Sequence, residues 1–121
     1  MGDGWKLRIK NWRFGRGEVV LVKDVYKLCE KLPNSEDYNL KNQLRRAVVS
    51  VALNIAEGKS RKTAKDFSNF LNISAGSLAE VGAILNLCEE LNYLQDLGTV
   101  YSKIEILGMK INALRHSLNN K

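Results

Sequence analysis

Hydrophobic residues recur at three- and four-residue steps through most of the chain, beginning near residue 18. This spacing places them on one face of an α-helix, because an α-helix has about 3.6 residues per turn. Breaks in the pattern fall at Pro33, at Gly58 with the polar residues that follow, and at Gly98. The pattern therefore predicts four helices, over about 18–32, 39–57, 63–94 and 98–118. Helices with such short connections predict an all-α, antiparallel up-down four-helix bundle over residues 18–121.

The expected helix ends rest on local signals. Pro33 disfavours helical geometry at the residue before it and predicts the end of the first helix. Gly58 is expected to adopt a left-handed conformation that ends the second helix. Thr63, three residues before Asp66, is expected to cap the third helix. Without a proline to stop it, that helix would run to about Leu94 and span about 48 Å, which suits a rod-shaped bundle.

The predicted helices carry more apolar residues than one buried stripe needs. In the second helix the stripe through Leu44, Val48 and Ile55 faces the core, and further apolar residues cover the opposite side: Val49, Ala52, Leu53 and Ala56. Monomeric proteins rarely expose large contiguous apolar patches, so this second face predicts a homo-oligomer. The interface residues that we expect are Val49, Leu53, Ile73, Ile84, Leu87 and Leu91.

The formal net charge of +6 lies mostly at the N-terminus. Residues 1–17 hold five basic residues and one acidic residue, whereas the remaining 104 residues hold 14 basic and 12 acidic ones. The basic residues of this arm are Lys6, Arg8, Lys10, Arg13 and Arg16. They are interleaved with Trp5, Leu7, Ile9, Trp12 and Phe14, and from residue 5 to residue 10 the alternation is that of an extended chain. The arm is therefore predicted to be a segment separate from the bundle.

Three interpretations of the arm stay open. Its cations and rings are suited to contact phosphates and to stack on bases of RNA or DNA. Its apolar side is equally suited to dock, as a strand, on a partner or a neighbouring subunit. The third interpretation is a frayed terminus or a leader translated from an early start codon.

The bundle itself offers further candidates for nucleic-acid binding: Arg45, Arg46, Lys59, Arg61, Lys62 and Lys65. In a ring of subunits these cations would be repeated, which would strengthen the field at one rim of the assembly. The alternative is an ordinary solvated loop whose cations cap helix ends.

Specific motifs relate the sequence to a known family. They are QLRRAVVSVALNIAEG at 43–58, Arg61, DFSNFLNISAGSLAEV at 66–81 and LNYL at 91–94. Over about residues 19–118 the chain resembles the four-helix-bundle proteins encoded in intervening sequences of bacterial 23S rRNA genes. The resemblance implies a rod-shaped bundle, a closed pentamer and no established catalytic residues. Accessory proteins of diversity-generating retroelements share this fold, which implies a second partner class, a reverse transcriptase.

The polar residues inside these motifs are Asn54, Glu57, Gly58, Arg61 and Glu80. We expect them to be structural rather than catalytic, because buried polar groups are ordinarily hydrogen-bonded. Asn54 should bond a facing backbone group, and Glu57 should pair with Arg61. Glu80 should pair with Arg45 or Arg46.

No pattern of catalytic or metal-binding residues is found in the sequence. Cys29 and Cys88 are far apart in apolar contexts, and His116 is the only histidine. No phosphate-binding loop or nucleophile elbow occurs, so we predict no enzyme activity, no cofactor and no metal. No apolar run of about 18 residues and no signal peptide is present, which predicts a cytoplasmic protein without a membrane span.

Two functional hypotheses follow. The first is a non-enzymatic, homo-oligomeric accessory that binds nucleic acid, above all RNA, through the arm and the loop at 59–65. The second is a protein-interaction scaffold, such as a retroelement accessory that binds a reverse transcriptase.

Overall fold

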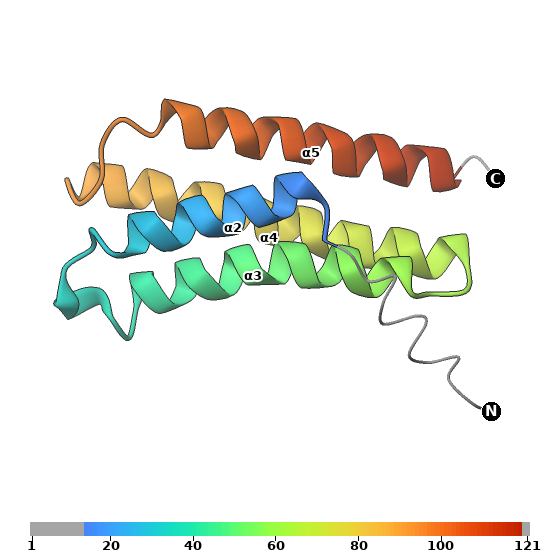
Figure 1. Cartoon of the computed structure of the whole chain (residues 1–121), viewed down its shortest axis with the longest axis horizontal. Coiled ribbons are helices and arrows are strands. Elements are labelled where there is room, and N and C mark those ends of the chain that lie inside the picture. The colour runs from blue at the N-terminus through green and yellow to red at the C-terminus, as the bar shows by residue number, and fades with distance from the viewer. Residues whose placement is uncertain (1–13, 120–121) are drawn as a thin grey trace.

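The structure, a computed structural model, describes residues 14–119. It contains the helices α2 (Arg16–Cys29), α3 (Leu40–Lys59), α4 (Ala64–Glu90) and α5 (Gly98–Asn119), with a short 3₁₀ turn η1 (Asn34–Glu36) before α3. Residues 14–119 include no strand, so the predicted all-α, four-helix class is confirmed. Figure 1 shows the helices side by side along the long axis. The connection between α3 and α4 lies at one end, and the other two connections lie at the opposite end.

Helix α2 begins and ends slightly earlier than predicted. The N–H of Gly15 donates a hydrogen bond to the Glu18 carboxylate at 2.7 Å, which satisfies a backbone group at the start of the helix. At the other end, the N–H of Leu32 bonds the Cys29 carbonyl at 3.1 Å, so the chain tightens into turns before Pro33. The helix therefore ends at Cys29 rather than at residue 32.

Gly58 lies inside α3 and does not end it, so the predicted left-handed cap is wrong. The glycine serves a close approach between helices instead. A Cβ atom at this position would lie 2.7 Å from Cδ1 of Phe67 and 3.1 Å from Cβ of Phe70, both on α4. Helix α3 continues one residue further, to Lys59.

The start of α4 agrees with the prediction, and its end does not. Asp66 N–H donates to the Thr63 hydroxyl at 3.1 Å, which confirms the predicted cap. The helix stops at Glu90, four residues before the expected end, because Asn92 adopts a left-handed conformation with φ of 61°. The N–H of the following residue, Tyr93, then bonds the Cys88 carbonyl at 2.9 Å, as in a Schellman turn.

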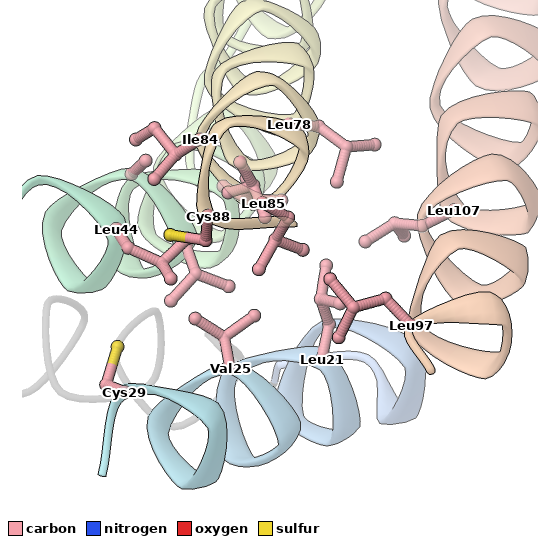
Figure 2. Close-up of a cluster of buried hydrophobic side chains, with 14 of the residues drawn as sticks. Leu21, Val25, Cys29, Leu44, Leu78, Ile84, Leu85, Cys88, Leu97 and Leu107 are labelled. Carbon is pink, nitrogen blue, oxygen red and sulfur yellow. The ribbon is translucent and has the colours of Figure 1, made fainter. Parts of the chain in front are cut away.

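A single apolar core runs between the helices. Figure 2 shows Leu21 and Val25 of α2 pointing toward α4. Leu21 is buried, whereas Tyr26 on the same helix is exposed at 42%. The fully buried side chains are Leu21, Val25, Cys29, Leu44, Val48, Val51, Leu71, Ser74, Val81, Leu85 and Cys88.

Small polar side chains join α3 to α4. The hydroxyl of Ser74, wholly buried, donates to the Val51 carbonyl at 2.8 Å. The hydroxyls of Ser50 and Ser77 lie 2.9 Å apart. Because these side chains are short, the two helices can pack closely along the middle of the molecule.

By its length and mean hydropathy, α4 is also long and apolar enough to cross a membrane, but the core helix of a soluble protein passes the same test.

Candidate nucleic-acid interface

The two ends of the molecule carry opposite charge. At the end that holds η1 and the connection from α4 to α5, residues 30–37 and 89–96 include only one basic residue, Lys31. A hydrogen bond of 3.0 Å from the Tyr93 hydroxyl to Glu36 joins these two stretches. The acidic residues at this end are Glu30, Glu36, Asp37, Glu89, Glu90 and Asp96.

The opposite end is basic. Between residues 58 and 65, at the connection from α3 to α4, four exposed cations occur without an acidic residue: Lys59, Arg61, Lys62 and Lys65. The C-terminal end of α5 lies at the same end, since the Ser68 hydroxyl donates to the Asn119 side chain at 3.2 Å. We call the four cations the basic end. The structure thus places the predicted basic loop, residues 59–65, at the end of the molecule opposite the acidic residues.

Arg61 is held in place by two neighbours. Its guanidinium pairs with the Glu57 carboxylate at 3.4 Å and lies 4.6 Å from the centre of the Phe70 ring. The Ser60 hydroxyl donates to the Glu57 carbonyl at 2.7 Å, which tightens the same turn. The predicted pairing of Glu57 with Arg61 is therefore confirmed.

Asn54 bonds its own helix rather than a facing element. Its amide donates to the Ser50 carbonyl at 2.8 Å and to the Ser50 hydroxyl at 2.9 Å. The predicted bond to a facing backbone group is wrong, because a suitable acceptor lies one turn earlier. Through Ser50, Asn54 is linked to Ser77 of α4, so it supports the packing of the two helices.

Arg45 and Arg46 have different environments. Arg45 is half-buried, with its guanidinium 5.8 Å from the centre of the Tyr26 ring. Arg46 is exposed and lines a cleft of about 310 Å³ between α3 and α4, together with Glu80. Among residues 14–119 neither arginine forms an ion pair with Glu80, contrary to the prediction. Arg46 is thus the better placed of the two to meet a ligand.

A second basic surface was not predicted. A groove of about 260 Å³ between α2 and α5 has Arg16, Lys103 and Lys110 around an apolar floor that includes Val20 and Ile106. Lys103 also pairs with Asp24 of α2 at 2.5 Å. The groove lies between residues almost 90 positions apart in the chain. The sequence signal that could have revealed this groove is the seven-residue spacing of Lys103 and Lys110, which places both lysines on one face of a helix.

Four of the predicted cations, Lys6, Arg8, Lys10 and Arg13, lie outside the described residues. Arg16 is the member of the arm that the structure describes, and it is exposed at the first turn of α2.

The predicted interface residues divide into two groups. Leu53, Ile73, Leu87 and Leu91 are large apolar side chains that are about half exposed, and Val49 is half-buried. Ile84, by contrast, is only 7% exposed and belongs to the core. Ala52 and Ala56, which we placed on a second apolar face, are also buried. Ile106 and Met109 of α5 are large apolar side chains that are exposed as well.

The titratable side chains show no arrangement for metal binding within the described part of the chain, where no group of three or more His, Cys, Asp or Glu residues gathers. Burial raises the pKa of both the Cys29 and the Cys88 thiols, so these groups stay protonated near neutral pH. Burial and a hydrogen bond to Glu89 raise the pKa of Tyr101. These shifts result from core packing.

Comparison with known proteins identifies the family. The family model described as 23S rRNA-intervening sequence protein matches residues 16–113. The chain belongs to this family. The match spans the four helices, from the first residue of α2 into the last turns of α5. No curated protein matches the chain.

The family match leaves most of the arm outside it. It begins at Arg16, so the aromatic residues Trp5 and Trp12 and the first four cations precede the part that this intervening sequence protein shares with its family. The basic end and the groove between α2 and α5 both lie within the matched part.

Proposed function

We propose that this intervening sequence protein is a non-enzymatic, homo-oligomeric accessory that binds nucleic acid, with RNA as the expected ligand. The observation that carries the proposal is the separation of charge along the rod, with the basic end at one extremity and six acidic residues at the other. Nucleic acid binds through its phosphates, so a ligand would engage the basic end and be repelled by the acidic one.

The arm and the groove add to this surface. Arg16 leads from the basic arm into α2 and lines the groove with Lys110. The cations on the rim of that groove are suited to meet phosphates. A nucleic acid that reaches both the arm and the groove would therefore contact charges from the N-terminal segment and from α5.

The oligomer is the second part of the proposal. Ile73, Leu87 and Leu91 lie exposed on α4, and Ile106 and Met109 lie exposed on α5. Burial of apolar surface contributes about 25 cal/mol per Å², so a second copy that covered these side chains would be stabilised. We propose an up-down bundle in a closed pentamer, the state that the family resemblance implies. A ring would repeat the basic end around one rim.

The absence of enzyme activity is proposed from the chemistry of the described residues. The two thiols are buried, and His116 is exposed on the last turns of α5. Burial raises the pKa of both thiols, and for Cys29 the nearby cations Arg45 and Lys41 do not reverse this, so neither thiol is activated as a nucleophile.

The nucleic-acid proposal is tested by binding of a short single-stranded RNA of mixed sequence at several salt concentrations. The variant Lys62→Gln/Lys65→Gln removes two cations from the basic end. Its matched control, Lys27→Gln/Lys31→Gln, removes two exposed lysines of the segment that leads toward the acidic end. If Lys62 and Lys65 each contact a phosphate, the first variant should lower the salt slope by about 1.4, because each contact contributes about 0.7 on single strands. The control should keep the slope.

Equal slopes for the two variants would contradict a role for the basic end, and so would an absence of binding at about 50–100 mM salt. Deletion of residues 1–13, which hold four cations, should lower the slope further. Light scattering at micromolar concentration tests the oligomer, and a species at the chain mass of 13.6 kDa would contradict it. Ile73→Gln/Leu87→Gln should dissociate the oligomer.

A further inference from the structure

An apolar groove lies between α2 and α3, on a surface that the proposed function does not use. Its volume is about 260 Å³, and its lining includes Phe14, Val19, Val22, Val49 and Leu53. Apart from the stem of Lys23, every lining side chain is apolar. The groove therefore has no polar group that would favour a charged ligand.

The groove exposes apolar surface that water solvates poorly. Leu53 is 54% exposed and Phe14 is 46% exposed, although both lie beside buried residues of the two helices. A covering apolar side chain would remove this surface from water. The groove therefore favours an apolar occupant.

The position of Phe14 indicates the occupant. Phe14 is the first described residue, and it lines the groove itself, so the thirteen preceding residues are covalently joined to the bundle at the groove. Trp12 is two residues earlier. Since an extended chain spans at most about 3.6 Å per residue, its Cα lies within about 7 Å of the Cα of Phe14.

The backbone at the start of the bundle favours the same conclusion. Gly15 is extended, with φ of −67° and ψ of 156°. An extended Gly15 turns the chain out of the helix at the point where Phe14 lines the groove, so the residues that precede Phe14 are joined to the bundle there.

We propose that Trp12 of the same chain occupies the groove between α2 and α3. A second copy is the less favoured occupant, because a side chain two residues from the groove has a high effective concentration that another molecule lacks. Leu53 and Val49 then belong to the binding site for Trp12, whereas the exposed residues of α4 stay available for contacts between subunits. The inference does not depend on nucleic-acid binding.

The chain contains its own reporter for this contact. Its two tryptophans, Trp5 and Trp12, both lie in the arm, so tryptophan emission reports on the arm alone. In the variant Trp5→Phe all emission comes from Trp12. We expect blue-shifted emission and several-fold weaker quenching by acrylamide than in the same variant unfolded in urea. Acrylamide is neutral, so the charge of the arm does not bias the quenching.

Two substitutions in the Trp5→Phe background test where the Trp12 indole binds. Leu53→Asn changes an exposed residue of the groove and should shift the emission to the red and restore quenching. Ile73→Asn changes a similarly exposed residue of α4, 51% exposed, and should leave Trp12 protected. Circular dichroism and urea unfolding verify that both variants stay folded.

Three outcomes would overturn the inference. The first is quenching of Trp12 in the folded chain that equals quenching in urea. The second is protection that survives Leu53→Asn, which would place the indole elsewhere. The third is protection that is lost on dilution or in Ile73→Asn, which would place it in a contact with a second copy. The oligomer and RNA measurements are independent of these readouts, so either proposal can fail alone.

Discussion

The close approach of α3 and α4 at Gly58 leads to a specific prediction about stability. In Gly58→Ala the new Cβ would lie 2.7 Å from Cδ1 of Phe67 and 3.1 Å from Cβ of Phe70. Carbon atoms attract best at about 3.5–4.0 Å, so both contacts are repulsive. The Phe67 ring can turn to relieve the first contact. The Cβ of Phe70 is attached to the backbone of α4, so relief of the second contact requires the helices to separate.

The magnitude follows from two opposed contributions. Alanine is favoured over glycine inside a helix by about 0.8–1.0 kcal/mol. Overpacking of a well-packed contact costs about 1–3 kcal/mol. Gly76→Ala supplies the matched control, because Gly76 is exposed inside α4 and a Cβ there would meet no atom within 4 Å. The helical preference cancels in the comparison, so Gly58→Ala should be less stable than Gly76→Ala by about 1–3 kcal/mol.

Urea unfolding followed by far-UV circular dichroism measures this difference. All proteins must be compared at one concentration, because association stabilises the folded state by mass action. We expect Gly76→Ala to be more stable than the parent chain and Gly58→Ala to be less stable. If Gly58→Ala gains as much stability as Gly76→Ala, the close approach of the two helices is not a constraint and the reasoning is refuted.

Further predictions concern two contacts between helices and the two buried thiols. Ser74→Ala removes a buried hydroxyl that donates to α3, so urea unfolding should show a loss of about 1 kcal/mol. Asp24→Asn weakens the partly exposed pair with Lys103; the loss should be below about 1 kcal/mol and should vanish at high salt in the same assay. Burial raises the pKa of the Cys29 and Cys88 thiols, so at pH 8 alkylation should be slow in the folded protein and fast in urea. The unfolded chain ionises its thiols near the ordinary pKa of 9.0, whereas the folded chain keeps them protonated to higher pH. The free energy of unfolding should therefore fall as pH rises past 9.0, and a flat profile there would contradict this account.

Several local features were predictable from the sequence. The periodicity of apolar residues gave four helices, and Thr63 marked the start of α4, because a capping side chain acts within a few residues. The pairing of Glu57 with Arg61 was predictable for the same reason, since both residues lie one turn apart. Asn92 was missed, although asparagine can end a helix, because apolar residues continue past it at Tyr93 and Leu94.

Other features depend on which helices are neighbours. Helix α3 packs against both α2 and α4, so it is covered on more than one side. This explains why Ala52 and Ala56, on the face that we expected to meet another subunit, are buried within the chain. Ile84 is buried for a similar reason, because α4 packs against α3 and α5. A helical wheel shows which residues share a face, but it does not show how many neighbours cover that face.

The sequence by itself determined the helices, the family and the local excess of positive charge, because each depends on residues close together along the chain. Only the tertiary structure decided where the charges and apolar side chains meet. It placed Arg16 beside Lys110, and Phe14 beside Leu53. It also gathered six acidic residues at the end opposite the basic one. These juxtapositions join distant segments, and they follow from the packing of the helices against one another.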